Sequence, residues 1–273
     1  MASPELESLE VELLLEGVQR QFGLDLRAHC RPTLLRRLRR HLRAETLPSV
    51  SALQAQVLHD QGALERMLRG LSAQTVALFD EPDFYLAFRR KVVPQLRTHP
   101  TVRIWVAGAG SGEQAWSLAM LLDEEGMLGR FRIYATDASD AQVEASRGGV
   151  IAELDPAAEG RYQRAGGTDT LGRHLDFESG RAAIKPALKS AVFFAQHNLA
   201  TDAAFNEFNV VLCRNVLLSF NRSLHNRVHG RLHESLGRFG ILGLGRKESL
   251  ARTPHVSEYE EIEGGGRLYR RLS

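Results

Sequence analysis

The sequence has few cysteines and no long apolar run. Only two of its 273 residues are cysteine, Cys30 and Cys213, and they stand far apart without metal-ligand spacing. A disulfide framework is therefore not expected, and a reducing cytoplasm suits this composition. No apolar stretch approaches the roughly 18 residues of a membrane-spanning helix, so we expect no membrane insertion. The acidic N-terminal segment lacks the basic start of a signal peptide, which also makes the cytoplasm the expected location.

The chain also lacks a strong charge of either sign. Lys and Arg number 35 against 33 Asp and Glu, a formal net charge of +2. This near balance argues against general nucleic-acid binding but leaves room for a local basic patch. The ten histidines show no ligand clustering along the sequence, so we expect surface or core histidines and no metal site.

The first 72 residues predict a small all-helical domain. Apolar residues recur there at helical spacing in three stretches, which cover residues 5–22, 32–44 and 50–72. We expect a linker at 73–83 and a second, larger domain at 84–273.

The second helix carries a row of arginines opposite its leucines. These are Arg36, Arg37, Arg39, Arg40 and Arg43. A solvated surface is one explanation. A docking face for an acidic partner, such as a helical bundle rich in glutamate, is the other, because the planar fork of arginine binds carboxylates bidentately.

The larger domain is organised around residues 102–120. An apolar strand over 102–106 leads into three alternate glycines, Gly108, Gly110 and Gly112, and Glu113 then begins a segment with helical spacing. Glycines let the backbone turn sharply and approach a ligand, and a helix N-terminus favours negative charge.

About twenty residues further on, a second apolar run ends in Asp137. An acid at the tip of the second strand typically accepts hydrogen bonds from the two ribose hydroxyls of a nucleoside. The glycine loop and this acid together predict a nucleoside-containing cofactor. They do not separate NAD from S-adenosylmethionine.

Strands alternating with helices predict a doubly wound, Rossmann-like α/β sheet. Further strands are expected at 192–195, 208–213 and 240–245, followed by a closing antiparallel pair at 259–262 and 267–271.

Ligands of such a sheet lie beyond the carboxyl ends of its strands. Asn198 and Asn215 follow two of the expected strands, so we expect both near the glycine loop and Asp137.

The order of these motifs resembles one family, the CheR chemotaxis methyltransferases, which are S-adenosylmethionine-dependent protein-glutamate O-methyltransferases. The similar segments are FDEPDFYLAF (79–88), IWVAGAGSGEQAWSLAM (104–120), IYATDAS (133–139), FFAQHNLATD (193–202), FNVVLCRNVLLSFN (208–221) and LGLGRKESL (242–250). The basic second helix and the terminal LYRR also look like the family. The resemblance implies a small all-helical domain followed by a Rossmann-like methyltransferase domain.

The resemblance also implies roles for residues at the carboxyl ends of the strands. Glu113 would meet the methionyl ammonium of the cofactor and Asp137 its ribose, while Asn198 and Leu199 would lie along the adenosine. The full set implied to line the cofactor is Ala107, Gly108, Gly110, Gly112, Glu113, Asp137, Ala138, Asn198, Leu199, Arg214 and Asn215.

By the same resemblance, a methyl group would pass from S-adenosylmethionine to a glutamate carboxylate of a methyl-accepting receptor or another acidic helical protein. S-adenosylhomocysteine would remain, and no metal is required. The basic helix would dock on that partner, and we expect a monomer.

The chain departs from the family at three positions, and two of these, 80 and 219, are assigned by the resemblance to the reacting centre. The family usually reads T-x-F-F-R-D-P where residues 76–82 read VALFDEP, so Val76 and Asp80 replace a threonine and an arginine. After CRNV, Ser219 replaces a tyrosine. Reversing the charge at position 80 brings two carboxylates together in the reaction, and these repel unless one is protonated.

Two main hypotheses therefore stay open. The protein is an active methyltransferase with altered geometry or substrate, or it is a degenerate relative that acts as a cofactor-binding or protein-docking regulatory module. A third interpretation, an NAD-dependent oxidoreductase, lacks a candidate site for hydride transfer.

Residues 148–190 are glycine-rich and show no clear run of alternating strands. Some relatives use a small β subdomain in this region to tether a receptor tail. We do not expect tethering here.

Overall fold

The computed structural model describes residues 3–71, 77–151, 154–178, 181–251, 253–262, 264 and 266–272. It divides into two compact units, one made of Met1–Ala73 with Leu218–His225 and the other of Gln74–Leu217 with Asn226–Ser273. The first unit is helical and the second is built on a sheet, so the predicted order of a small helical domain and an α/β domain is confirmed.

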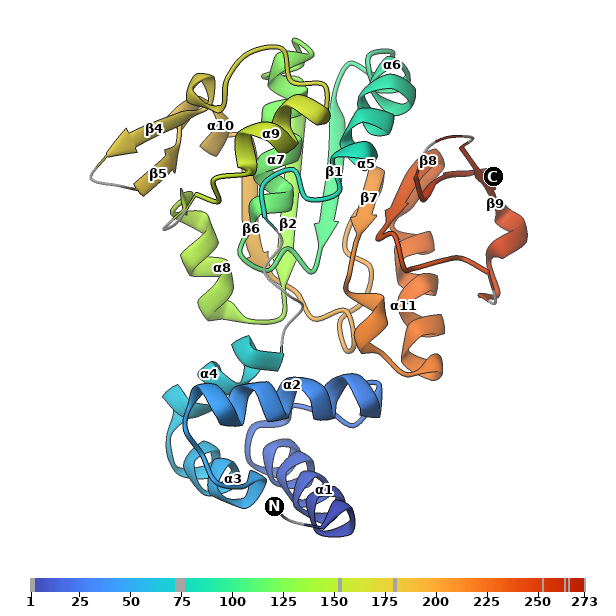
Figure 1. Cartoon of the computed structure of the whole chain (residues 1–273). Helices are drawn as coiled ribbons and strands as arrows, with labels where there is room; N and C mark the ends of the chain where they lie inside the picture. The colour runs from blue at the N-terminus through green and yellow to red at the C-terminus, as the bar shows by residue number, and fades with distance from the viewer. Residues whose placement is uncertain are drawn as a thin grey trace. The chain divides into compact units, whose positions relative to one another are not determined.

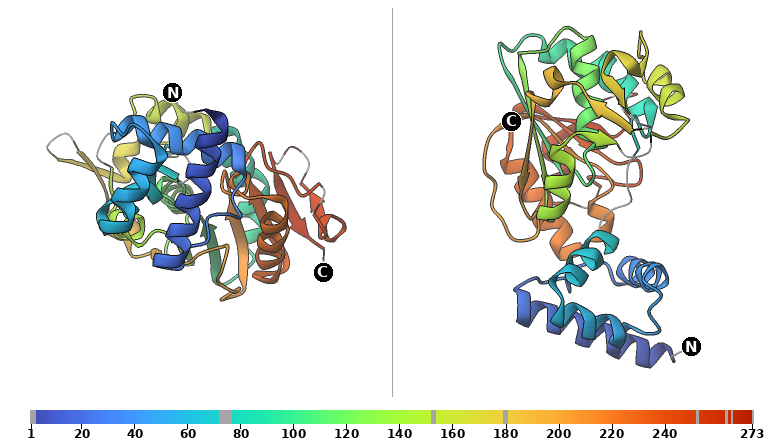
Figure 2. Two further views of the ribbon diagram at one scale, coloured as in Figure 1. Left: turned by 90° about the horizontal axis from the view of Figure 1, so that it is seen from below. Right: turned by 90° about the vertical axis from the view of Figure 1, so that its left-hand side faces the viewer.

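The helical unit contains α1 (Pro4–Phe22), α2 (Arg31–Ala44), α3 (Val50–His59) and α4 (Gln61–Leu71). The hydroxyl oxygens of Ser3 and Ser49 cap the starts of α1 and α3, and Gly23 ends α1 in a left-handed conformation. Helix α1 packs beside α3, and α2 beside α4 (Figures 1 and 2). The buried side chains between them include Val11, Leu14, Val18, Leu38, Leu53 and Met67.

A distant stretch of chain, Leu218–His225, completes this unit. The N–H of Cys30 donates to the carbonyl of Ser219 at 2.8 Å, and the N–H of Asn221 donates to the carbonyl of Ala28 at 2.9 Å. The ring of Phe220 packs edge-on against His29. No motif in the sequence indicated this pairing, because it consists of a single β-bridge.

The second unit is built on a seven-stranded sheet. Its strands are β1 (Val102–Ala107), β2 (Phe131–Asp137), β6 (Val192–Gln196), β7 (Phe208–Cys213), β8 (Leu236–Leu244), β9 (Tyr259–Glu261) and β10 (Leu268–Arg271). Their order is β6-β2-β1-β7-β8-β10-β9 (Figure 1). The first five are parallel, and β10 runs antiparallel to both β8 and β9. The predicted Rossmann-like sheet with a closing antiparallel pair is confirmed.

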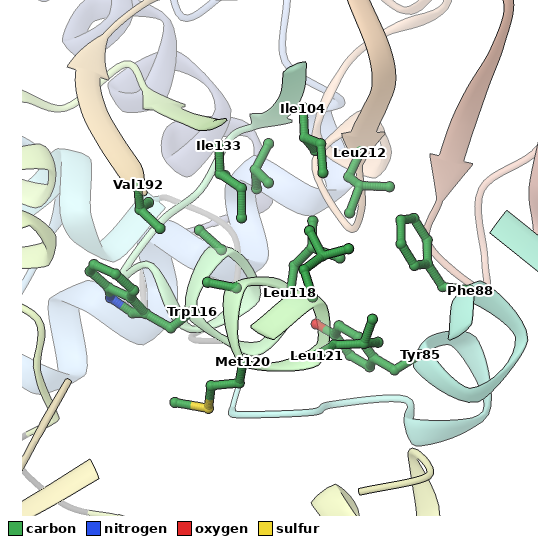
Figure 3. Close-up of a cluster of buried hydrophobic side chains, with 14 of the residues drawn as sticks. Tyr85, Phe88, Ile104, Trp116, Leu118, Met120, Leu121, Ile133, Val192 and Leu212 are labelled. Atoms are coloured by element: carbon green, nitrogen blue, oxygen red, sulfur yellow. The ribbon is translucent and has the colours of Figure 1, made fainter. Parts of the chain in front are cut away.

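Helices cover this sheet. They are α5 (Pro82–Ala87), the π-helical turn η1 (Phe88–Val92), α6 (Val93–Leu96), α7 (Glu113–Glu124), α8 (Asp140–Arg147), α9 (Ala158–Arg164), α10 (Pro186–Lys189) and α11 (Arg222–Glu234). Every residue of α7 from Gln114 to Leu122 is buried. Figure 3 shows Trp116 of α7 beside Val192 of β6, and Leu118 facing Ile104 of β1 and Leu212 of β7. Helix α7 therefore holds its N-terminus, and the glycine loop before it, in a fixed position.

The parallel register places four loops at one edge of the sheet. Ala107 pairs with Thr136 and Asp137 with Gln196, so β1, β2 and β6 end together. On the other side of β1, β7 ends at Cys213, which pairs with Leu244. The loops after β1, β2, β6 and β7 are thus neighbours, as the sequence analysis expected.

A second, three-stranded antiparallel sheet contains β3 (Val150–Ile151), β4 (Leu175–Glu178) and β5 (Arg181–Ile184) in the order β3-β5-β4. The expectation that residues 148–190 lack a run of strands is therefore wrong. Strands of two to four residues are too short to show a period-two pattern, although Leu175 and Ile184 do bury their side chains. The presence of this sheet does not show whether it tethers a receptor. Our expectation that it does not stays a prediction.

Within the residues that the structure describes, no helix is both long and apolar enough to cross a bilayer.

Candidate active site

The loop after β1 needs glycine for two separate reasons. Gly108, Gly110 and Gly112 all have left-handed backbones, with φ of 72°, 56° and 92°. A Cβ on Gly108 would also lie 2.4 Å from Cγ2 of Val216, in the turn after β7, whereas a Cβ on Gly110 would meet nothing within 4 Å. Gly108 therefore permits the close approach of two loops.

Asp137 ties this loop to the end of β2. One carboxylate oxygen accepts the N–H of Gly110 at 3.0 Å, and the other accepts the N–H of Ser139 at 3.1 Å. Burial raises the pKa of Asp137, and these backbone hydrogen bonds only partly offset the effect. The carboxylate is fixed in place with lone pairs left over, as an acceptor for two ribose hydroxyls needs to be.

Glu113 stands at the first position of α7, directly after Gly112. The hydroxyl of Ser111 donates a hydrogen bond to its carboxylate. Burial raises the pKa of Glu113, and the Ser111 hydrogen bond lowers it in part. A cationic ligand beside Glu113 would stabilise the ionised carboxylate and lower its pKa again.

The loop after β6 is ordered by Asn198. Its side-chain oxygen accepts the N–H of Ala200 at 2.9 Å, and its own N–H donates to Asp202 at 2.9 Å. The neighbouring Leu199 is buried. Asn198 thus has a clear structural role, and its expected contact with adenosine stays a prediction.

After β7, Arg214 is buried and forms an ion pair with Glu81 at 2.5 Å. Its guanidinium lies over the ring of Phe84, 3.9 Å from the ring centre. The Nε atom is buried and has no hydrogen-bond partner in the part of the chain that the structure describes. Arg214 therefore retains one unused donor.

Asn215 follows with a left-handed backbone, at φ 64°. The carboxylate of Glu248 accepts three backbone N–H groups, from Asn215 at 2.9 Å, Leu217 at 2.7 Å and Gly245 at 2.8 Å. Glu248 is itself buried. It is a positioning residue that the sequence analysis missed, although it lies within the segment LGLGRKESL.

Tyr85 was missed as well. It is fully buried, and burial raises the pKa of its hydroxyl, while the nearby Arg214 lowers it. Asp80 is close enough to act on the same hydroxyl electrostatically. A buried tyrosine, an arginine and the substituted position 80 are thus gathered around α5.

The two remaining residues of the set have smaller roles. Ala107 is the buried last residue of β1, and the carbonyl of Ala138 accepts a hydrogen bond from Gln196 at 3.1 Å.

The two substituted positions fall in different compact units. Asp80 is half-buried just before α5, and its N–H donates to the carbonyl of Ala77 at 3.1 Å. Ser219 ends the short helix η3 (Leu217–Ser219) and groups with the helical unit. Val76 lies outside the described residues.

The arginines of α2 divide into two groups. Arg39 forms an ion pair with Glu7, and Arg37 and Arg40 donate to the carbonyls of Leu71 and Gly70. The other two, Arg36 and Arg43, are exposed. Three of the five arginines of the predicted docking face therefore already bind groups of the helical unit.

Comparison with known families decides the assignment. Residues 74–264 match the S-adenosylmethionine-binding domain of CheR methyltransferases, and residues 9–72 match the all-alpha domain of the same proteins. The chain belongs to the CheR methyltransferase family. It is a methyltransferase by family, and S-adenosylmethionine is the cofactor of its larger domain.

Relatives span the whole chain. The Cher3 protein of Pseudomonas putida is 37% identical over 272 residues, which cover 99% of this chain and all of that protein. Chemotaxis protein methyltransferase 1 of Pseudomonas aeruginosa is 28% identical over 96% of this chain and 97% of its own length. Among solved structures, the glycopeptide N-methyltransferase MtfA aligns over 63% of this chain and 55% of its own, at 12% identity. Its TM-score of 0.37 is too low to add to the assignment.

The two glycines provide a matched pair of variants. Gly110→Ala forces an alanine into a left-handed backbone and should cost about 1–2 kcal/mol in the free energy of unfolding. Gly108→Ala adds the contact with Val216, so we expect roughly 1–3 kcal/mol more. Urea unfolding followed by circular dichroism, without cofactor, measures both. Equal losses would show that the approach of Val216 does not constrain the loop.

Proposed function

We propose that this protein transfers a methyl group from S-adenosylmethionine to glutamate side chains of a methyl-accepting chemoreceptor in the cytoplasm. The observation that supports it most is the joint placement of Asp137, the glycine loop and Glu113 at one edge of the sheet. Several relatives are named as chemotaxis protein methyltransferases, which supports the choice of substrate.

The residues present fit this cofactor. S-adenosylmethionine, when bound, supplies a methyl group on a positively charged sulfur and carries a second positive charge on its ammonium group. Glu113 and Asp137 are half-buried carboxylates whose pKa values are raised by desolvation, so a ligand with a cationic group and hydroxyl groups would stabilise the ionised form of both. We assign the ammonium to Glu113 and the ribose to Asp137, with Asn198 and Leu199 along the adenosine and Asn215 nearby.

The acceptor in this proposal is a glutamate carboxylate, which is already a nucleophile at neutral pH. No general base is needed, so the protein contributes positioning and control of charge. A dry site favours a reaction in which opposite charges are neutralised.

One observation favours a second candidate function. Asp80 and Glu81 are two consecutive acidic residues, and the carboxylate of Glu81 is already paired with Arg214. An incoming glutamate beside Asp80 would be repelled by its carboxylate, because the charge of Arg214 is already balanced by Glu81. In this alternative the chain binds the cofactor but acts as a regulatory or docking module.

Cofactor affinity tests whether the two carboxylates bind the cofactor. Glu113→Gln and Asp137→Asn should each weaken S-adenosylhomocysteine binding about 10- to 100-fold, because a hydrogen bond to a charged group contributes roughly 1.5–3 kcal/mol. Asp140→Asn is the matched control, since Asp140 is an exposed acid three residues from Asp137 and should leave affinity unchanged. Isothermal titration calorimetry measures the affinity of all three variants. If Asp140→Asn weakens binding as much as the other two substitutions, the assignment is contradicted.

The same titration has a defined pH dependence. The pKa values of Glu113 and Asp137 are raised above the ordinary 4.5 and 3.8, so both groups take up protons earlier as the pH falls. The cofactor binds to the ionised carboxylates. As the pH is lowered, its affinity should therefore begin to fall at a pH above these ordinary values, and binding in that range should release protons. A Glu113→Gln variant should show a shallower decline.

Restoring the family's residues at positions 80 and 219 tests whether these two substitutions limit catalysis. The double variant Asp80→Arg with Ser219→Tyr should raise methyl transfer to receptor glutamates by at least about tenfold if these positions limit the rate, a gain of roughly 1.4 kcal/mol in transition-state stabilisation. Transfer of a radiolabelled methyl group to a receptor fragment measures it. A double variant that binds cofactor and still transfers no more methyl than the parent would rule out this explanation.

Docking can be tested apart from catalysis. Arg36→Glu with Arg43→Glu should abolish capture of a receptor fragment without changing cofactor affinity, because these side chains are exposed on α2. Arg20→Glu, on the exposed surface of α1, is the control for charge alone. Unchanged capture by the double variant would reject α2 as the docking face.

A further inference from the structure

Two histidines and a glutamate meet at the C-terminal end of α11. His233 lies in the last turn of that helix, His255 directly precedes the turn η4 (Val256–Glu258), and Glu258 ends it. One potential ligand atom from each lies within 4.8 Å of the others. Among the described residues, no other group of three such side chains has this geometry. No histidine cluster is evident along the sequence, because these residues come together only in the fold.

The carboxylate of Glu258 spans the two imidazoles. Its oxygens lie 3.0 Å from Nε2 of His233 and 2.8 Å from Nδ1 of His255. The imidazole ring centres are 4.6 Å apart. Donor atoms of a tetrahedral zinc site are about 3.3 Å apart, given zinc–ligand bonds of about 2.0–2.1 Å. Small rotations of His255 and Glu258, both only half-buried, would make the three donors converge.

A neighbouring hydroxyl is a hydrogen-bond partner for the ring nitrogen of His233 that would not bind the metal. The hydroxyl of Tyr259 lies 3.1 Å from Nδ1 of His233. If Nδ1 carries the proton and donates it to this oxygen, the lone pair of Nε2 faces Glu258 and His255. Ligand histidines in metal sites are held by such a partner on their other nitrogen.

The charges around the cluster are mixed. A helix C-terminus favours a cation, and His233 is at the end of α11. Arg271 brings a positive charge, but its guanidinium donates to the carbonyl of His233 at 2.9 Å and to that of Leu236, and so it satisfies part of the helix end. Glu258 supplies the negative charge that a divalent cation needs.

We propose that His233, His255 and Glu258 bind one divalent transition-metal ion, with Zn²⁺ as the representative. Two imidazole nitrogens and one carboxylate oxygen are donors that suit this class and that Mg²⁺ does not favour. The ion joins the end of α11 to the start of β9. Among the described residues, that strand is three residues long and pairs only with β10, so a metal clip would stabilise this edge of the sheet.

Calorimetric titration of the full chain with ZnCl₂, after chelator treatment, tests the proposal. We expect one equivalent of Zn²⁺ to bind and Mg²⁺ not to bind. His255→Gln and Glu258→Gln should each weaken Zn²⁺ binding at least about tenfold, and Tyr259→Phe about tenfold, as loss of a supporting hydrogen bond typically does. His59→Gln, an exposed histidine outside the cluster, should bind as the parent does.

Amide hydrogen exchange locates the ion. Zn²⁺ should slow exchange at Tyr259, Glu260 and Glu261 in the parent and not in Glu258→Gln. Circular dichroism first establishes that His255→Gln and Glu258→Gln are folded, which their half-exposed positions favour. Zn²⁺ affinity that is unchanged in both variants, or absent in the parent, would overturn the proposal. The cluster would then be a carboxylate hydrogen-bonded between two imidazoles.

Discussion

The hydrogen bond between the Gly110 amide and the Asp137 carboxylate is the constraint on which the cofactor end of the molecule depends. It joins the loop after β1 to the end of β2, and the parallel register between these strands allows it to form. Three left-handed glycines form the loop that reaches Asp137, and α7, buried from Gln114 to Leu122, holds the other end of the loop. Sequence, register and packing therefore all specify one loop conformation, which consistent local and global preferences require.

Burial then gives this end of the sheet its chemical character. Partial burial raises the pKa of both Asp137 and Glu113, because desolvation disfavours the ionised carboxylate. Glu248 is in a different situation, because three backbone N–H groups converge on its carboxylate. The first two acids thus remain available to a cationic ligand, whereas Glu248 is committed to holding the turn that contains Asn215.

The sequence predicted the family, the Rossmann-like sheet after a helical domain, and the cofactor, and all of these are confirmed. The sheet and a nucleoside-containing cofactor were predicted from the glycine loop together with Asp137, whereas the family and S-adenosylmethionine were predicted from the segments that resemble CheR proteins. The small sheet of β3, β4 and β5 was missed because its strands are too short for a periodic pattern. Glu248 and Tyr85 were missed for another reason: their contacts join segments far apart in the chain. The individual roles of the cofactor, catalytic and docking residues, and the domain boundaries, stay predictions, because cofactor and partner contacts depend on molecules that the fold alone does not contain.

The loop from Gly245 to Glu258 connects the two sites. Near its start, Gly245 and Glu248 hold the turn of Asn215 beside the cofactor edge. At its end, His255 and Glu258 meet His233 on α11. The three proposed metal ligands lie outside the set of residues assigned to the cofactor, so loss of the metal would leave the cofactor assignment untouched.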